Sequence, residues 1–389
     1  MGIMANSVSI CQFQIAGDLP QGNIFEWIGE CLDKFAFSSI ENSADELSIG
    51  WVRTDDYQNT DFAGLQQFRR DYFVSFTLRR DQRRIPTPLL KAYQKIAEQD
   101  FLNANPGFFR VPKQKKEDIR DAVRLALFAR SLPSPSMYDV VWDTRNGLVT
   151  LASLSSKVID LFETEFKKSF PGLRLLMIHP YARAQRVTPE HLREDLERSN
   201  LASTESVLDL IRANSWIGQD FLLWLLHQTL TGSGEYSVSI PGVFGDGEPF
   251  TAFMNDRLLL QANSEAGIQR ITVAGAQDDF REVLAALRMG KGITEATIHL
   301  EKDENAWKLT LKGELFHFGS FKCPAVQIEK DQTVDKLAEE EAVFYERMHL
   351  LQSGCQLFDS LFAAFLIERL SGQWATKLEE IKIWIGTGD

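Results

Sequence analysis

Hydrophobic and polar residues alternate along this chain in short blocks whose period changes repeatedly between two and about 3.6. A period of two predicts β-strands, and apolar positions three and four residues apart predict amphipathic helices. In the first half, the pattern predicts strands at 8–17, 47–54, 71–80, 138–143, 148–153 and 173–182. It predicts helices at 23–37, 89–102, 115–132 and about 155–170.

Local signals mark the ends of some of these elements. Thr87 is a candidate N-cap for the helix at 89–102, with Pro88 at its first helical position. Asn146-Gly147 separates the strands 138–143 and 148–153, and this dipeptide between two β-rich segments predicts a hairpin. With the following helix and strand, the hairpin would complete a plain ββαβ unit.

The second half repeats the mixture with longer elements. A long or kinked helix is predicted over 203–230, with Gly218 at the candidate break. Further elements are strands at 235–242, 250–263 and 268–275, a helix at 278–290, a hairpin at 293–315, and a helical region from 333 almost to the end. The ordering predicts an α+β fold with mostly antiparallel sheets and packed helices. The predicted division is a first region, 1–185, a polar connector, 186–203, and a second region, 204–389.

Composition is that of a globular protein with large cores. The 389 residues are 44% hydrophobic and 25% charged, with a formal net charge of -12. A uniformly acidic surface would repel polyanions, so nucleic-acid binding requires a local basic patch. The N-terminus lacks a basic segment ahead of its apolar stretch, and the longest apolar stretches are shorter than the ~20 residues of a membrane span. A cytoplasmic protein without membrane contact is expected.

Residues for catalysis or metal binding are scattered. The four cysteines form no CxxC pair, which favours buried reduced thiols, and none of the six histidines stands at metal-ligand spacing. His227, in an apolar helical stretch, is interpreted as a core or interface residue. Acidic clusters, Asp55-Asp56 with Asp61 and Glu339 to Glu341, are candidates for Mg²⁺ in a nuclease, although adjacent acids are more often solvated. No catalytic residue, metal ligand or cofactor is predicted.

Basic residues, by contrast, cluster between positions 69 and 130. Lysine and arginine there can neutralise phosphates and release counterions without recognising bases. The pattern leaves a second interpretation open, a solvated face paired with acids elsewhere. The candidate DNA-binding residues are Arg69, Arg70, Arg79, Arg80, Arg83, Arg84, Lys113, Lys115 and Lys116.

Four segments in this part of the chain carry a resemblance to a known family. "IGWVRTD", "RRIPTPLLKAYQKIAE", "KQKKEDIRDAVRLALFARSLPS" and "VVWDTRNGLVTLASLSSK" follow, in order and at similar spacing, the pattern of the bacterial recombination-associated RdgC proteins. The resemblance covers roughly residues 45–185. The sequence "LFARSLPS" departs from the Pro-Arg-Ala-Phe turn of typical members.

The resemblance implies a DNA-binding protein that is not an enzyme. RdgC proteins resemble closed rings of two curved subunits around duplex DNA, bind with little sequence preference, and limit access of the RecA recombinase. A homodimeric, nucleoid-associated binder of double-stranded DNA is therefore expected, with single-stranded DNA left open as a further partner. A metal-dependent exonuclease and a protein-interaction scaffold without nucleic acid are the alternatives. Val140 and Trp142, on an alternating apolar strand, are expected in the core and not at bases.

Overall fold

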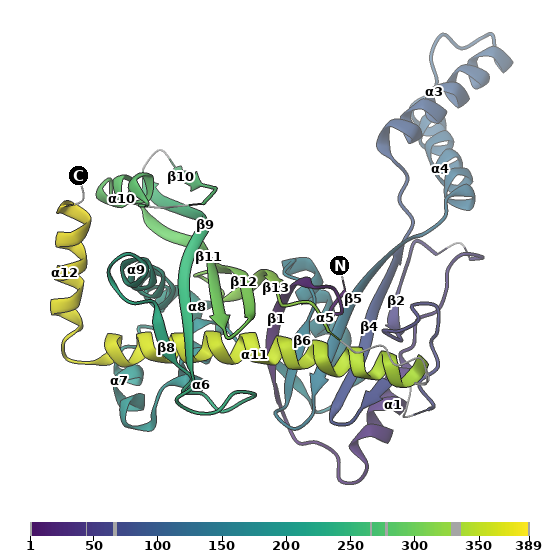
Figure 1. The fold of residues 1–389 in the computed structure, drawn as a ribbon. Helices are drawn as coiled ribbons and strands as arrows, with labels where there is room; N and C mark the ends of the chain where they lie inside the picture. The colour runs from purple at the N-terminus through teal and green to yellow at the C-terminus, as the bar shows by residue number, and fades with distance from the viewer. Residues whose placement is uncertain are drawn as a thin grey trace. The chain divides into compact units, whose positions relative to one another are not determined.

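The computed structural model describes residues 2–43, 45–64, 68–264, 267–276, 279–327 and 336–387. Within them the chain forms two compact units, and each is assembled from separate stretches of sequence. The hairpin unit comprises Gly17–Thr144 and Phe162–Leu173. The long-helix unit comprises Met1–Ala16, Arg145–Leu161 and Arg174–Asp389. The strand ladders in both units are antiparallel and helices accompany them, so the predicted α+β class is confirmed (Figure 1).

Antiparallel strands form the base of the hairpin unit. They are β2 (Leu47–Val52), β3 (Arg69–Arg70), β4 (Phe73–Gln82) and β5 (Ser134–Asp143), with β4 between β5 and β2, and β3 also paired to β4. The β4–β5 ladder runs without interruption from the Phe73–Asp143 pair to the Gln82–Ser134 pair. Helix α1 (Ile24–Lys34) begins after Asn23, whose side chain accepts a hydrogen bond from Phe25 N.

An aromatic cluster fills the core of this unit. Trp142 on β5 lies 5.7 Å from Phe170 between ring centroids, and Trp51 on β2 lies 5.2 Å from Phe76 on β4. Trp51 Nε1 also donates a hydrogen bond to Ser169 Oγ, at the end of α5 (Ser156–Ser169). Edge-on and tilted ring pairs of this kind add to the stabilisation from burial. Trp142 and Val140 are fully buried, which confirms their predicted place in the core.

Two helices connect β4 to β5. Helix α3 (Thr87–Ala104) and helix α4 (Lys113–Arg130) pack on each other, and we call this pair the helical hairpin (Figure 1). The predicted N-cap is wrong by one position, because Pro86 is the cap residue and Thr87 is already helical. Proline brings no side-chain acceptor, so its fixed φ, and not a capping hydrogen bond, starts the helix. Helix α3 has no buried residue, and α4 buries only Ile119 and Leu127.

The long-helix unit contains a larger sheet in the order β10-β9-β11-β12-β13-β1-β6, with β7 also paired to β1 and β8 to β9. The strands are β1 (Ser7–Ala16), β6 (Leu148–Leu151), β7 (Arg174–Met177), β8 (Glu235–Ser237), β9 (Pro249–Ser264), β10 (Gly267–Val273), β11 (Gly292–Lys302), β12 (Asn305–Lys312) and β13 (His317–Lys322). The strand predicted at 173–182 is too long, because Pro180 starts a helix there. Proline lacks the amide hydrogen that a strand ladder needs.

The longest helix of this unit is also largely buried. The helices are α6 (Pro180–Val187), η1 (Glu190–Leu192), α7 (Arg193–Arg198), α8 (Val207–Ala213), α9 (Trp216–Thr231), α10 (Arg281–Arg288), α11 (Lys336–Leu370) and α12 (Trp374–Thr387). Residues 186–203, the predicted connector, lie within this unit. By length and composition α11 would be long and apolar enough to cross a membrane, but 72% of its most apolar window is buried inside the protein. It is the core helix of the unit.

The predicted break at Gly218 is wrong. The helix stops at Ala213 and restarts at Trp216, while Gly218 lies inside α9. A Cβ atom at this position would lie 1.9 Å from the carbonyl oxygen of Gly313. Glycine is therefore needed for close packing of the helix against another backbone segment, and not for a kink.

Candidate nucleic-acid interface

The first pair of predicted arginines, on β3, is held against the hairpin unit. The guanidinium of Arg69 stacks 3.9 Å from the ring centroid of Phe25, and its Nε donates to the carbonyl of Asp71. Arg70 Nη1 donates to Ser75 Oγ at 2.8 Å. Both side chains are half-buried, so they offer little surface to a polyanion.

Alternation along β4 separates the next two arginines onto opposite faces. Arg79 makes two hydrogen bonds to the carboxylate of Asp81, at 2.9 and 2.8 Å, and a third to the carbonyl of Tyr57. The hydrogen bond with Asp81 raises the pKa of Arg79. Arg80 faces the other way and donates to Gln82 Oε1. The positive charge of Arg79 is thus compensated by the buried carboxylate of Asp81, whereas Arg80 is hydrogen-bonded to a neutral amide.

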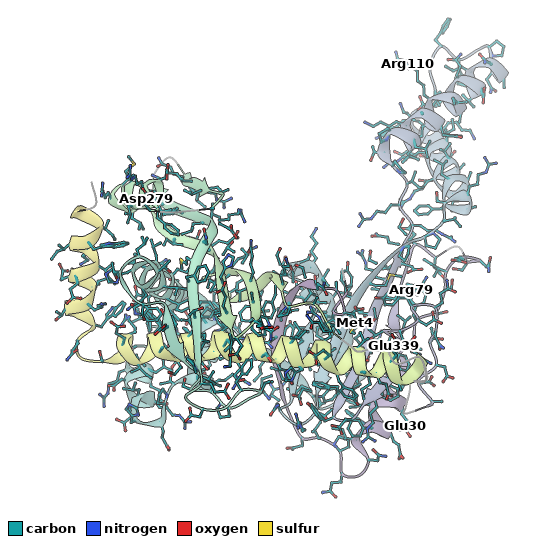
Figure 2. All side chains as sticks on the ribbon, in the orientation of Figure 1. Met4, Glu30, Arg79, Arg110, Asp279 and Glu339 are labelled. Atoms are coloured by element: carbon teal, nitrogen blue, oxygen red, sulfur yellow. The ribbon has the colours of Figure 1, made fainter. Side chains whose placement is uncertain are left out.

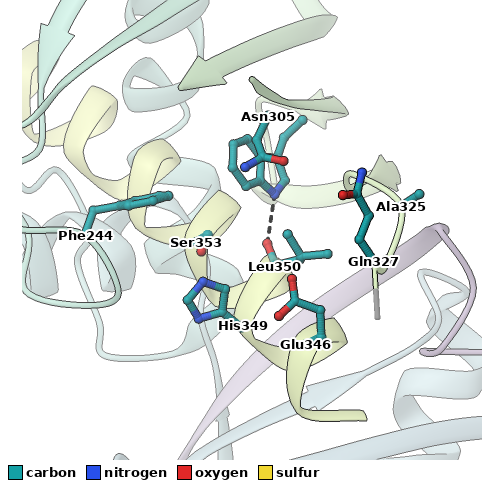
Figure 3. Close-up of a pocket in the computed structure, with 9 residues that line it drawn as sticks. Phe244, Asn305, Ala325, Gln327, Glu346, His349, Leu350 and Ser353 are labelled. Atoms are coloured by element: carbon teal, nitrogen blue, oxygen red, sulfur yellow. Dashed lines mark hydrogen bonds between the residues drawn. The ribbon is translucent and has the colours of Figure 1, made fainter. Parts of the chain in front are cut away.

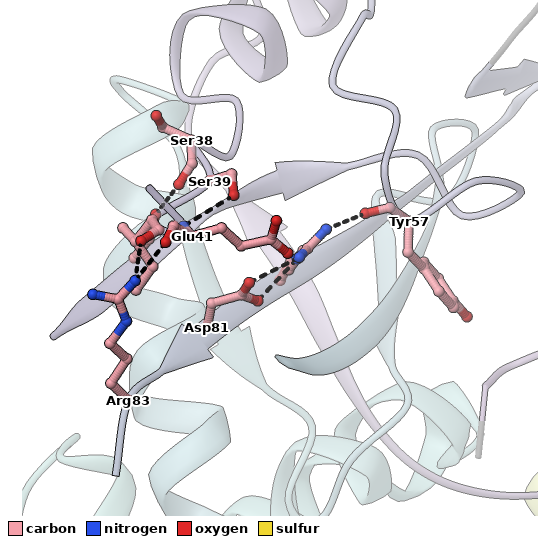
Figure 4. Close-up of polar contacts among 9 residues, drawn as sticks. Ser38, Ser39, Glu41, Tyr57, Asp81 and Arg83 are labelled. Carbon is pink, nitrogen blue, oxygen red and sulfur yellow. Dashed lines mark hydrogen bonds and ion pairs between the residues drawn. The ribbon is translucent and has the colours of Figure 1, made fainter. Parts of the chain in front are cut away.

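Arg83 is built into the fold. Arg83 is 5% exposed, and its guanidinium donates to the carbonyls of Ile40, Glu41 and Ser43. Figure 4 shows the guanidinium beside Glu41. These bonds tie the loop before β2 to the end of β4. The neighbouring Arg84 is exposed, and its Nε donates a hydrogen bond to Gln82 Oε1. The arginine pair therefore divides into one structural and one accessible side chain.

The predicted lysines lie at the start of α4, together with further cations on the helical hairpin. Lys113, Lys115 and Lys116 are exposed; Lys116 lies 3.3 Å from Glu98 on α3, and Lys115 lies 4.0 Å from Asp118. Figure 2 shows Arg110 at the far end of the hairpin, away from Arg79 on the sheet. Exposed ion pairs such as these contribute little to stability and leave the charges accessible.

The charge balance of the hairpin differs from that of the chain. Residues 87–130 contain nine lysines and arginines against five aspartates and glutamates, a net charge of +4 in a chain of -12. The exposed basic side chains outside the predicted set are Lys91, Lys95, Arg110, Arg120, Arg124 and Arg130. We call these, with Lys113, Lys115, Lys116 and Arg84, the cationic surface.

A separate cavity in the long-helix unit has a different character. It has a volume of about 300 Å³, and Trp307 and Leu350, joined by a hydrogen bond from Nε1 to the carbonyl, form part of its lining (Figure 3). Of the described residues that line it, the ionisable ones are Glu346 and His349, and none is a lysine or an arginine. A carboxylate in the lining disfavours a phosphate ligand.

The acidic residues that were candidates for Mg²⁺ in the loop 55–61 take part in local hydrogen bonds and an ion pair. Asp55 pairs with Arg53, while Asp56 and Asp61 accept hydrogen bonds from backbone amides of their own loop. In the part of the chain that the structure describes, no three or more His, Cys, Asp or Glu side chains are grouped to hold a metal ion. All four cysteines are free thiols. His227 is buried against Trp384, 5.1 Å between ring centroids, as expected of a core residue.

Comparison with known proteins identifies the family. A family model described as "Putative exonuclease, RdgC" matches residues 11–206, which is half of the chain and includes the entire helical hairpin. The chain belongs to the RdgC family. Membership supports a recombination-associated, DNA-binding role at the level of the family. No curated protein matches the chain significantly.

The RdgC match is wider than the predicted resemblance, which covered roughly residues 45–185. It begins within β1 and ends just before α8, so it takes in parts of both units. The sequence signal for the cationic surface was the density of lysine and arginine between 69 and 130. That signal did not separate exposed side chains from Arg83, because the carbonyls that bind Arg83 lie about forty residues earlier.

Replacing Arg83 with alanine is expected to destabilise the protein, because three carbonyls would lose their donor in a largely buried place. The expected cost is about 2–3 kcal/mol of unfolding free energy. Arg84→Ala, one residue away and exposed, should change it by less than about 0.5 kcal/mol. Thermal or urea unfolding of the two variants measures the difference, and equal stabilities would contradict the structural role of Arg83.

Proposed function

We propose that this RdgC-family protein binds duplex DNA without sequence preference through the cationic surface. The observation that carries the proposal is the net positive, solvent-exposed helical hairpin in a strongly acidic chain. DNA approaching other parts of an acidic surface meets repulsion, so the hairpin is where a phosphate backbone is attracted.

The chemistry of the surface favours phosphates over base edges. Lysine is a flexible point charge that suits phosphate, whereas base recognition in a groove uses side chains held in fixed, often bidentate geometry. Lys113 and Lys115 are exposed, and the 4.0 Å ion pair of Lys115 with Asp118 leaves the charge of Lys115 accessible. Each neutralised phosphate contributes through counterion release, which is independent of sequence.

The assembly we propose is a homodimer that encloses the duplex as a ring. One hairpin with nine cations covers a short stretch of backbone, and a second copy related by two-fold symmetry doubles the number of phosphate contacts. A ring on DNA limits access of the RecA recombinase by occupying its substrate. Because any duplex is a ligand, such a protein would associate with the nucleoid in the cytoplasm.

We further propose that binding does not lead to cleavage of DNA. The competing function, a metal-dependent exonuclease, is favoured by the description of the matching family model. A protein-interaction scaffold without nucleic acid is the other alternative, and it would leave the cationic surface without a polyanion. The three functions differ in what they do to DNA, so direct measurements separate them.

Replacing Lys113, Lys115 and Lys116 together with alanine should weaken binding equally for duplexes of unrelated sequence. The slope of log affinity against log salt should flatten by about 0.9 per lost contact, roughly two to three units in total. The matched control is the triple alanine variant of Lys157, Lys167 and Lys168, three exposed lysines of α5. Gel shifts over a range of salt measure both. An unchanged slope in the α4 variant, or an equal change in the control, would place the DNA surface elsewhere.

Light scattering of the purified protein should return a mass twice the 44.2 kDa of one chain. The physical reason is that two subunits are needed to close a ring through self-complementary contacts. A monomer mass at micromolar concentration, with DNA binding intact, would remove the ring and keep the binding surface.

Incubation with end-labelled duplex and Mg²⁺ should leave the DNA intact at protein concentrations that fully shift it. Chelation with EDTA should not alter the amount of DNA bound, since the proposed contacts need no metal. Accumulation of shortened products that depends on Mg²⁺ and scales with protein concentration would establish the exonuclease instead. Intact DNA with no shift at low salt would support the scaffold.

A further inference from the structure

The cavity beside Trp307 combines aromatic and polar side chains, and all of its described lining residues belong to the long-helix unit. Its volume of about 300 Å³ is at the lower end of the range for small-molecule sites. The rings of Phe244 and Trp307 meet edge to face, with 6.3 Å between their centroids. Figure 3 shows Glu346, His349 and Ser353 on successive turns of α11. Empty voids in a protein core are lined by apolar groups, so this mixed lining indicates a ligand site.

Ser353 is a buried polar residue that the fold leaves unused. It is 1% exposed, and its hydroxyl has no hydrogen-bond partner in the part of the chain that the structure describes. A serine inside a helix can bond to the carbonyl three or four residues earlier, but here the carbonyl of Leu350 accepts from Trp307 Nε1 at 2.8 Å. Two turns later on the same helix, the Oγ of Ser360 accepts from two backbone amides. A buried hydroxyl without a partner costs free energy, so the placement of Ser353 is better explained by a ligand than by stability.

Negative charge at this cavity comes from Glu346, a half-buried carboxylate. Two buried cations are near the described lining without being part of it. Lys302 lies over the ring of Phe244, 5.1 Å from its centroid, and its charge is compensated by Glu248 at 2.9 Å. Arg347 is fully buried, and its Nε donates to a backbone carbonyl near the N-terminus. The accessible permanent charge is therefore that of the carboxylate, which attracts a cation and repels an anion.

The two ends of the cavity differ in chemistry. Glu346 and Ser353 are seven residues apart on α11, which corresponds to about 10 Å along the helix axis. Trp307 is hydrogen-bonded to Leu350, which lies between them on the helix. One end thus provides a carboxylate, the middle an aromatic wall, and the enclosed end a neutral hydroxyl. A complementary ligand has a cation at one end, an apolar stem, and a neutral hydrogen-bonding group at the other end.

We propose that this cavity binds a small organic cation, a guanidinium on an apolar stem that ends in a neutral hydrogen-bonding group. The guanidinium pairs with Glu346, the stem packs on the aromatic rings, and the far end bonds to the hydroxyl of Ser353. A guanidinium suits this lining better than an ammonium, because it is weakly hydrated and stacks on aromatic rings. The cationic surface belongs to the hairpin unit, so binding of the organic cation does not depend on the proposed function.

Isothermal titration calorimetry with N-acetylarginine amide tests the site, at pH 8 so that histidine is uncharged. The unaltered protein should bind this probe with a Kd of about 1 mM or tighter, the affinity that a ligand of this size permits. N-acetylcitrulline amide has nearly the same shape without the charge, and it should bind at least about tenfold more weakly. Glu346→Gln should weaken binding of the arginine probe by at least about tenfold, and Ser353→Ala by about fivefold. The matched control is Glu341→Gln, at a half-buried glutamate of the same helix outside the described lining, which should bind as the unaltered protein does.

Thermal unfolding without ligand measures whether the fold itself uses the Ser353 hydroxyl. Ser360→Ala removes the acceptor of two backbone amides and should lower the melting temperature by about 1–4 °C. Ser353→Ala should leave the melting temperature unchanged or raise it, because the described chain loses no hydrogen bond. An equal fall in both variants would show that Ser353 serves stability and not a ligand.

Four binding results would overturn the proposal. No binding of the arginine probe at millimolar concentration would mean that the cavity holds water alone. Equal binding of the citrulline amide would show that no charge is recognised, and unchanged affinity in Glu346→Gln would move the cation elsewhere. A blocked pentapeptide with a central arginine should bind more weakly than the small probe, because its flanking residues exceed a cavity of about 300 Å³. Equal or tighter binding of the peptide would assign the site to an arginine of a partner protein.

Discussion

The uninterrupted pairing of β4 with β5 determines where the helical hairpin can be. Gln82, the last residue of β4, lies opposite Ser134, the first residue of β5, so the chain leaves the sheet and returns to it at one point. Both ends of the hairpin are therefore fixed by backbone hydrogen bonds. Behind this ladder, Trp142 and Phe76 pack with Phe170 in the aromatic core, which holds the two strands in register. The position of every cation on the hairpin depends on this arrangement.

Arginine serves two purposes in the hairpin unit, and exposure distinguishes them. Arg79 and Arg83 are bound by the protein's own oxygen atoms, and removing them would leave buried acceptors without donors. Arg84 and the lysines of α4 are on the surface and have weak partners. An acidic chain can thus contain a cationic surface without a conflict, because electrostatic attraction acts over about one Debye length and not over the whole molecule.

Much of the fold is predictable from the sequence because it depends on local periodicity. The strands that became β2, β4 and β5 and the helices that became α3 and α4 follow directly from their apolar spacing. The misplaced features depend on distant partners. Gly218 is required by the backbone of Gly313, almost a hundred residues later, and Arg83 is bound by carbonyls that precede it by some forty residues. The sequence therefore predicts the part of the chain where the exposed cations gather, while the roles of individual arginines needed the structure.

The absence of any buried residue in α3 has a consequence for the dynamics of the unit. Helices of this length are only marginally stable in water without tertiary packing, and here most of the support is the partner helix. The hairpin should then open locally at a small fraction of the free energy needed to unfold the sheet. Its amide hydrogens would exchange with solvent long before those of β4 and β5, and a bound polyanion would slow that exchange by holding both helices together.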